Sequence, residues 1–379
     1  MTITAPQKTA PASPSLQPTG WLRYLSFSVD HKVIGLQYLV CGFAFYLIGG
    51  AMAGAIRTEL LSPVSDFMAR DVYNQILTLH GTVMIFLWIV PVVNGAFGNY
   101  LIPFYVGARD MAYPRLNAVA FWLIPPAGLM LISSYFITGA AQSGWTAYPP
   151  LSITTPATGQ IIWILSVLLL GGSSIFGGIN FIATILKLRR PGLKLMQLPM
   201  YCWAMLGTSI LVVLSTPVLA GTLIMLSFDI VAHTGFFNPG MGGNVVVYQH
   251  LFWFYSHPAV YIMVLPAFGL VSEILPVHCR KPLFGYTTMV YSDHGHRCSW
   301  IGGVGSPHVH QWHSTLDASV LHDCDSLHCG SDWHQILQLA GNTLGRSNQL
   351  EQCCAVFLWL HCELRARRNH WCRARTGSV

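Results

Sequence analysis

Two histidines lie inside long apolar stretches of this chain, where an ionisable side chain is costly and is usually kept for function. His80 occurs in the segment L-H-G-T-V-M, and His257 occurs in H-L-F-W-F-Y-S-H-P-A-V-Y. A neutral imidazole nitrogen binds iron or copper well, and Gly81 beside His80 leaves room for a flat macrocycle between helices. The sequence therefore predicts metal ligation at both positions, with a hydrogen-bonded or interfacial histidine as the alternative.

Tyr261 strengthens the assignment of His257, because it follows one helical turn later and shares a helix face with it. His250 is expected nearer the outer surface, and His31 precedes the first apolar stretch. We expect these two histidines to make interfacial or polar contacts.

The elements that must position these side chains are six apolar stretches, each long enough to cross a bilayer, which takes about 20 residues. They cover residues 34–56, 77–105, 118–140, 160–186, 202–228 and 247–276. The chain is 53% hydrophobic and 9% charged, which excludes an ordinary soluble protein. Proline and glycine within the stretches indicate packed helices and not isolated anchors. The predicted fold is an all-α, polytopic membrane helix bundle.

Charged loops predict how the bundle is oriented. The basic residues near the expected cytoplasmic side are Lys8, Arg23, Lys32, Arg109, Arg115, Lys187, Arg189, Arg190, Lys194, Arg280 and Lys281. Residues 142–159 carry no charge, and residues 229–246 carry no Lys or Arg. By the positive-inside rule, the N-terminus and the even-numbered loops face the cytoplasm. The net charge of +6 is modest, and we expect no nucleic-acid partner.

The chain changes character at about Ser292. Residues 1–20 are rich in Pro, Thr, Ser and Ala and predict a disordered arm. Residues 21–291 form the predicted membrane domain and hold three of the ten cysteines and six of the sixteen histidines. Residues 292–379 hold the remaining cysteines and histidines and have no apolar run long enough to span a bilayer.

Out-of-frame translation would explain this tail. Read one nucleotide later, the codons of residues 303–318 permit V-W-A-H-H-M-F-T-S-G-T-P-P-W-M-R, and those of residues 331–345 permit P-T-G-I-K-F-F-S-W-L-A-T-L-W-G. Trp, Met and His codons leave little freedom, so two such segments from one constant offset indicate a frameshift. We expect the tail to be irregular, because its sequence was never selected to fold. A zinc module is the alternative, and its candidate ligands are His308, His310, His313, Cys324, Cys329 and Cys353, whose spacings match no usual zinc frame.

Several segments together resemble subunit I of the haem–copper terminal oxidases, most closely the aa3-type cytochrome c oxidases. They are T-L-H-G-T-V-M-I-F, G-N-Y-L-I-P-F-Y-V-G-A-R-D-M-A-Y-P-R-L-N, G-W-T-A-Y-P-P-L, Y-Q-H-L-F-W-F-Y-S-H-P-A-V-Y and R-K-P-L-F-G-Y. The resemblance covers nearly all of residues 20–291 and implies a twelve-helix family fold, of which this chain has six helices. It is highly specific because the segments occur in the family's order.

That resemblance implies a function, cofactors and partners. The expected activity is reduction of O2 to water with electrons from cytochrome c, coupled to proton pumping. The expected cofactors are two haems, of a-type, and copper, and the expected partners are oxidase subunits II and III. The expected location is a bacterial plasma membrane or an equivalent energy-transducing membrane. A quinol oxidase subunit I and a six-span transporter gated by His257 are the alternatives.

The resemblance also assigns roles to residues at the expected metal sites. His80 would be an axial ligand of the low-spin haem iron, with Arg57 at a haem substituent and Trp145 near the propionates. His257 would be one of three copper ligands. Tyr261 would be joined covalently to His257 and would donate an electron and a proton during cleavage of the O–O bond.

A proton path is implied as well. Asp110 would open it from the cytoplasm, with Asn99 and Asn117 beside it. Most of the family has a glutamate where this chain has Ala259. A subgroup replaces it with the pair that occurs here as Tyr255 and Ser256, whose hydroxyls can relay protons with water. The remaining metal ligands would lie beyond residue 291, in the shifted readings V-W-A-H-H-M and P-T-G-I-K, so we expect the chain as written to be truncated and inactive.

Overall fold

A computed structural model describes residues 23–61, 67–283, 285–287 and 290. Every regular element in these ranges is a helix, and six helical segments are long and apolar enough to cross a membrane. This confirms the predicted all-α membrane bundle. The arm at residues 1–20 and the tail at residues 292–379, with the suggested zinc ligands, lie outside the described residues.

The six spans differ in how regular they are. Four are single α-helices: α1 (His31–Glu59), α7 (Ala157–Lys187), α8 (Met200–Val231) and α9 (Val245–Cys279). The second joins α2 (Arg70–Thr82), η2 (Val83–Ile89), η3 (Pro91–Ala96) and α3 (Phe97–Val106), and the third joins α4 (Pro114–Trp122) and α5 (Ile124–Ile137). The loops carry three short helices: α6 (Leu151–Thr154), η4 (Leu195–Gln197) and η5 (Pro239–Met241).

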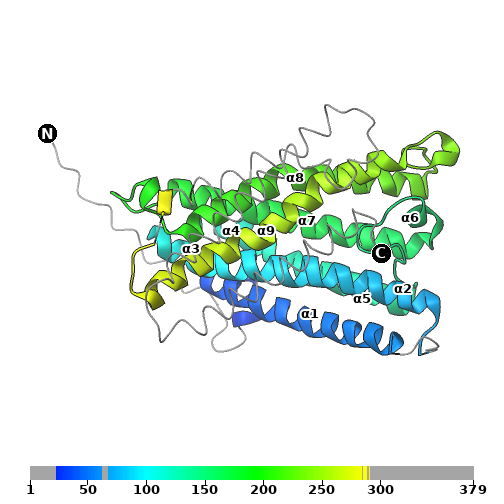
Figure 1. The fold of residues 1–379 in the computed structure, drawn as a ribbon, viewed down its shortest axis with the longest axis horizontal. Helices are drawn as coiled ribbons and strands as arrows, with labels where there is room; N and C mark the ends of the chain where they lie inside the picture. Colours follow the sequence, from blue (N-terminus) through cyan, green and yellow to red (C-terminus); the bar gives the residue numbers. More distant parts are fainter. Residues whose placement is uncertain (1–22, 62–66, 284, 288–289, 291–379) are drawn as a thin grey trace, which may run out of the picture.

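The spans lie side by side along one long axis, with α1 at one edge of the view and α8 at the other (Figure 1). Neighbouring spans pack together: α8 lies against α7 and α9, and α1 lies against the second span. Side chains of α1 that face outward include Val40, Phe43 and Leu47, each more than half exposed. Such an apolar outer surface suits contact with lipid.

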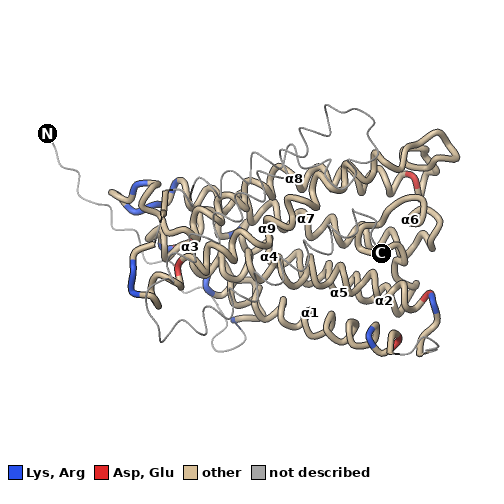
Figure 2. The backbone as a smooth tube through the Cα atoms, viewed as in Figure 1, with Lys and Arg blue, Asp and Glu red and all other residues tan. Residues whose placement is uncertain are grey.

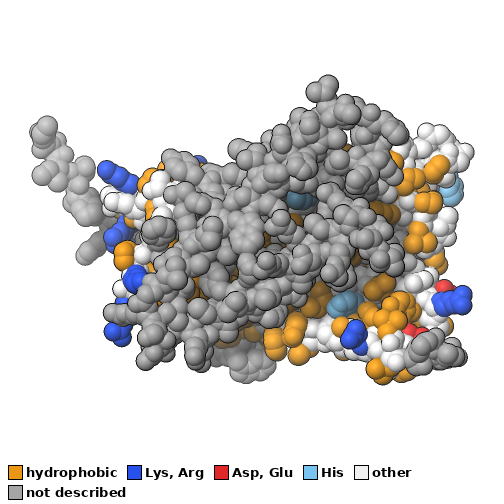
Figure 3. Space-filling view, viewed as in Figure 1, with side chains coloured by type: hydrophobic (Ala, Val, Ile, Leu, Met, Phe, Trp, Pro, Cys, Tyr) orange, Lys and Arg blue, Asp and Glu red, His pale blue; other side chains and the backbone are white. Residues whose placement is uncertain are grey.

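Among the described residues, charged ones lie at the two ends of the bundle (Figure 2). Among the described Lys and Arg residues, only Arg57 and Arg70 belong to the end where α1 finishes and α2 begins. Where described residues are visible in the space-filling view, apolar side chains cover much of the flank between the ends (Figure 3). The middle of the bundle is therefore apolar, as a bilayer requires.

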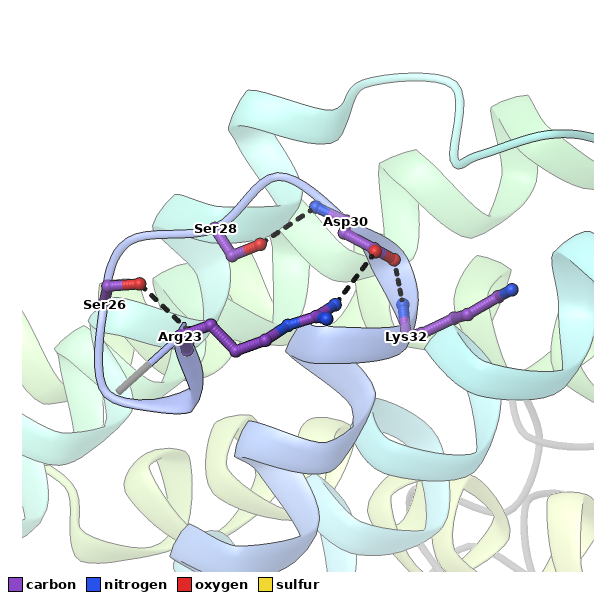
Figure 4. Close-up of polar contacts among 5 residues, drawn as sticks. All are labelled: Arg23, Ser26, Ser28, Asp30 and Lys32. Atoms are coloured by element: carbon purple, nitrogen blue, oxygen red, sulfur yellow. Dashed lines mark hydrogen bonds and ion pairs between the residues drawn. The ribbon is translucent and has the colours of Figure 1, made fainter. Parts of the chain in front are cut away.

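A polar cluster fixes the start of α1 (Figure 4). The Asp30 carboxylate accepts a hydrogen bond from the Lys32 backbone N–H at 2.9 Å, which caps the helix. The same carboxylate lies 3.5 Å from the Arg23 guanidinium, but both side chains are more than 40% exposed, so the ion pair adds little stability. The Ser28 hydroxyl accepts from the Asp30 N–H at 3.3 Å.

His31, one residue into α1, is only 3% exposed and bonds the backbone oxygen of Asn99 at 2.9 Å. Pro103 lies four residues after Asn99 and has no N–H, so that carbonyl lacks its usual helical donor. A carbonyl can only accept, so Nδ1 of His31 carries the hydrogen. The predicted polar contact of His31 is confirmed, and its partner is a carbonyl freed by proline.

The second span widens into π-helix over η2 and η3, on either side of Val90. Pro91 begins η3 and cannot donate a backbone hydrogen bond, which disfavours a regular α-helix there. Single π turns often occur at functional sites. The widened region carries Asn94 and Phe86 towards α7, α8 and α9.

Candidate functional site

His80 lies near the end of α2 and bonds the α1 backbone. Its Nδ1 is 2.9 Å from the Gly49 oxygen. Since a carbonyl only accepts, Nδ1 carries the hydrogen and Nε2 keeps its lone pair. An imidazole held through one nitrogen is the usual arrangement of a metal-ligating histidine, so this side chain suits an axial iron ligand.

The glycines near His80 differ in what faces them. A Cβ at Gly81 would lie 3.2 Å from Cδ1 of Trp145, and a Cβ at Gly49 would lie 2.6 Å from Sδ of Met84, so these two glycines permit close packing. On the same helix as Gly49, added Cβ atoms at Gly50 and Gly54 would meet no heavy atom within 4 Å. The open surface therefore lies on α1, and the donor chemistry of His80 fits haem iron.

A hydrogen-bond network holds Trp145 in place. The Gly144 N–H donates to Oγ1 of Thr78 at 2.9 Å, and Nε1 of Trp163 donates to Oγ1 of Thr82 at 2.9 Å. The sequence analysis missed these threonines. Their hydroxyls lie one turn apart on α2 and just before and after His80, a pattern that could have indicated a supporting role.

Further contacts attach the same loop to its surroundings. Oε1 of Gln75 accepts from the Ala140 N–H at 3.0 Å, and the Ser143 hydroxyl donates to Oε1 of Gln160 at 2.7 Å. The segment that carries Trp145 is thereby bonded to both α2 and α7.

Aromatic side chains connect Trp145 to α9. The ring centroids of Trp145 and Phe252 are 5.7 Å apart, and those of Trp145 and Trp253 are 6.4 Å apart. The Trp253 Nε1–H donates to the Tyr148 hydroxyl. Burial raises the pKa of Tyr148, while this hydrogen bond lowers it. The loop therefore bridges the two spans that carry His80 and His257.

His257 and Tyr261 meet as predicted, with ring centroids 4.9 Å apart and an interplanar angle of 60°. Tyr261 is 8% exposed and packs with Leu211 and Val212 of α8. Within the described ranges no three His, Cys, Asp or Glu side chains form a group that could hold a metal. His257 alone does not fit a copper ion, and the expected co-ligands lie outside the described residues.

Tyr255 and Ser256 are both buried just before His257. Tyr255 stacks on Phe86, with centroids 6.4 Å apart and planes 8° apart. Ser256 is 1% exposed, and its hydroxyl has no hydrogen-bond partner among the described residues. Buried hydroxyls usually find a partner, so water is the expected one here.

Asp110, in the loop between α3 and α4, is half-buried and accepts from the Met111 N–H at 2.7 Å. Burial raises the pKa of Asp110, and this hydrogen bond and the neighbouring His31 lower it to a smaller extent. Asn99 and Asn117 are each 1% exposed. Within the described ranges, both side-chain polar atoms of Asn117, and Oδ1 of Asn99, lack a hydrogen-bond partner, which favours water beside them.

A cavity of about 50 Å³ lies between α1, the π-helical region, α5, α7 and α8. Its polar lining is Tyr38, Asn94, Ser173, Ser174, Thr208 and Ser209. The buried Oγ1 of Thr208 has no hydrogen-bond partner in the part of the chain that the structure describes. On this measure of volume a water needs about 10–15 Å³, so the polar space suits water. The sequence analysis missed these residues, although hydroxyls gathered on α7 and α8 within apolar spans could have indicated them.

The fold and these side chains define a multi-pass membrane protein with a half-buried histidine, His80, that can bind a metal through Nε2. The family described as "Cytochrome C and Quinol oxidase polypeptide I" matches residues 33–297. The chain therefore belongs to that family of haem–copper oxidases. This membership favours the oxidase over the transporter that six spans alone allowed.

Similarity to individual proteins of this family supports the same assignment. Cytochrome c oxidase subunit 1 of Synechocystis sp. is 63% identical over 272 residues, which cover 72% of this chain and 49% of that protein. The subunit 1 of Thermostichus vulcanus is 61% identical over the same shares. That of Bacillus subtilis is 43% identical over 70% of this chain and 42% of the relative. The chain thus spans about half the length of the curated relatives it matches.

Proposed function

We propose that this chain provides six spans of the catalytic subunit I of a respiratory terminal oxidase. The complete subunit reduces O2 to water with electrons from cytochrome c and couples the reaction to proton pumping. The relatives named cytochrome c oxidase subunit 1 support this choice. The observation that carries it is the His80 imidazole, bonded through Nδ1 to Gly49 with Nε2 left to bind iron.

The proposed low-spin haem lies beside α1 and α2. When bound, haem of a-type stores and transfers single electrons. His80 would hold the iron through Nε2, while Gly81 lets Trp145 pack closely beside it. Arg57, exposed at the end of α1, would donate hydrogen bonds to a polar haem substituent, and Trp145 would lie near the propionates.

His257 is proposed as one of three copper ligands, and the second haem belongs to the same oxygen-reducing centre. The other ligands are expected beyond residue 291, so no step through copper follows from the described residues. Tyr261, beside His257, holds a phenolic proton that can leave together with an electron. The covalent bond between the two side chains is the family's feature and is part of the proposal.

The proposed proton path starts at Asp110 and continues past Asn117 and Asn99. Its next part is the water-sized cavity with Ser173 and Thr208 in its wall. It ends at Tyr255 and Ser256, whose hydroxyls and bound water can accept and donate protons in turn. Ala259 has no carboxyl group, so the relay does not depend on an acid in α9.

The proposed orientation places the N-terminus and the basic end of the bundle in the cytoplasm. Partners are oxidase subunits II and III and cytochrome c. In this proposal residues 21–291 are the membrane domain. The expected arm, residues 1–20, and the expected out-of-frame tail without the remaining ligands, residues 292–379, lie outside the described residues. As written, the chain is therefore inactive. A quinol is the second candidate donor, because the matching family includes quinol oxidases.

Haem binding tests the first half of this proposal. The purified chain, mixed with haem, should give a ligated haem spectrum that His80→Ala abolishes and His250→Ala keeps. Equal haem affinity in all three proteins would contradict it. Sequencing the gene across codons 288–295 tests the frameshift. After frame correction, oxygen uptake with reduced cytochrome c, compared with a quinol, identifies the donor.

A further inference from the structure

Pro266 leaves a gap in the hydrogen bonding of α9. Proline has no backbone N–H, so the carbonyl of Ile262, four residues earlier, loses its helical donor. Ile262 is 2% exposed, so bulk water cannot replace the lost bond. An unpaired carbonyl at such a site costs free energy.

Asn94 supplies the missing donor from another span. Its Nδ2 donates to the Ile262 oxygen at 3.2 Å, across 168 residues of sequence. The carbonyl only accepts, so the amide must turn its NH2 group towards α9. The amide oxygen therefore points away from α9, and Oδ1 of Asn94 is buried with no hydrogen-bond partner among the residues that the structure describes. Asn94 also lines the polar cavity, where a water can donate to that oxygen.

The bond lies next to the residues proposed for the chemistry. Ile262 directly follows Tyr261, and both pack in one cluster with Leu211, Val212 and Leu265. Val90, one helical turn before Asn94, packs against the same cluster. A proline inside a helix permits bending at the bond it removes. The direction in which Tyr261 points therefore depends on what holds the Ile262 carbonyl.

We propose that Asn94 is a positioning residue that replaces the backbone bond lost at Pro266 and thereby fixes Tyr261 and His257. The roles of Tyr261 and His257 rest on the proposed function. The bond between Asn94 and α9 does not, and it can be tested without haem, copper or turnover.

A double-mutant cycle isolates the bond. Asn94→Leu should raise the unfolding equilibrium constant about threefold to tenfold, as for other polar contacts between membrane helices. Pro266→Ala restores an N–H that can reach the Ile262 carbonyl. In that background Asn94→Leu should change the constant less than about twofold, because the donor is no longer needed.

Asn99→Leu is the matched control, because Asn99 is another buried asparagine of the second span, and its NH2 donates to the Gly95 oxygen. Asn99→Leu should raise the unfolding equilibrium constant by the same factor with proline or alanine at position 266. If Asn94→Leu also raised it by the same factor in both backgrounds, the proposal would be overturned. If Asn94→Leu alone does not fold, refolding of the double variant supports it, and failure of both contradicts it.

The 13C chemical shift of the Ile262 carbonyl, measured by nuclear magnetic resonance, reports directly on its hydrogen bond. Labelling Ile carbonyl carbons with 13C and Met nitrogens with 15N selects Ile–Met pairs, which occur in this chain at 224–225 and 262–263. Asn94→Leu should move the Ile262 signal upfield and leave the Ile224 signal in place, and Pro266→Ala should reverse the change. An unmoved Ile262 signal would overturn the proposal.

Oxygen uptake separates this inference from the proposed function. In the frame-corrected oxidase, Asn94→Leu should lower turnover with metal content retained, and adding Pro266→Ala should restore it. If the double-mutant cycle shows coupling between positions 94 and 266 but the protein binds no haem, the proposed function is contradicted. The hydrogen bond of Asn94 to α9 would still stand. Lost turnover that Pro266→Ala does not restore would contradict the positioning role.

Discussion

Nδ1 of His80 lies 2.9 Å from the backbone oxygen of Gly49, which joins the second span to α1 at the proposed haem site. The contact sets the tautomer of His80, because only a ring N–H can donate to a carbonyl. The acceptor is a backbone oxygen, so every residue at position 49 would provide it. A larger residue requires Met84 to move, since an added Cβ would lie 2.6 Å from Sδ of Met84.

Gly49→Val should therefore weaken haem binding even though His80 remains. The larger side chain displaces Met84 and shifts the carbonyl that orients the imidazole, and loss of such outer contacts typically lowers metal affinity about tenfold or more. Haem titration followed by absorbance measures the change. Gly221→Val is the control, because a Cβ at Gly221 meets nothing within 4 Å. Unchanged affinity in Gly49→Val would show that Gly49 does not orient His80.

Thr78→Val should loosen the loop that carries Trp145. The half-buried Gly144 N–H loses its acceptor, and an N–H left unpaired away from water costs up to about 1–3 kcal/mol. We expect faster hydrogen exchange at Gly144 and a lower melting temperature. Thr78→Ser keeps the hydroxyl and should restore both. If Thr78→Val and Thr78→Ser exchange equally fast, the hydroxyl does not hold the loop.

Asp110 should make the protein less stable as the pH rises. Burial raises its folded-state pKa above the usual 3.8, so the folded protein binds this proton more tightly than the unfolded chain. The contribution of Asp110 to the free energy of unfolding is then fully present below its unfolded-state pKa. It is lost as the pH rises through its folded-state pKa. Asp110→Asn should remove this slope in unfolding titrations, with Asp71→Asn as the control for losing a carboxylate. A steeper slope in Asp110→Asn would contradict the raised pKa.

Some of these features follow from sequence alone. The six spans were predicted because hydropathy and length need no knowledge of neighbouring helices. His80 and His257 were predicted because an ionisable residue in an apolar span is costly. The partner of Asn94 is 168 residues away, and that of Thr78 is 66 residues away, so only packing brings them together. Pro91 disfavours a regular α-helix, but a proline alone does not predict π-helix on both sides of Val90.

His257→Ala and Tyr261→Phe should both abolish oxygen reduction in the frame-corrected enzyme, but for different reasons. His257→Ala removes a proposed copper ligand and should lower copper content. Tyr261→Phe keeps the ring that packs beside His257 and loses only the O–H. Metal analysis alongside oxygen uptake separates the two. Near-normal uptake in Tyr261→Phe would mean that Tyr261 is only a packed aromatic side chain.

Ser256→Ala should slow turnover without lowering the stability of the protein. The Ser256 hydroxyl is buried with no hydrogen-bond partner among the described residues, so its removal should leave the unfolding free energy unchanged or raise it. Proton delivery should slow about twofold to tenfold, because bound water replaces only part of the relay. The control is Ser215→Ala, since the Ser215 hydroxyl is also buried but donates to the Leu211 oxygen at 2.7 Å within its own helix. Ser215→Ala should keep full turnover. If Ser256→Ala also kept full turnover, its hydroxyl would not lie on the proton path, and the path would have to reach the site through other groups.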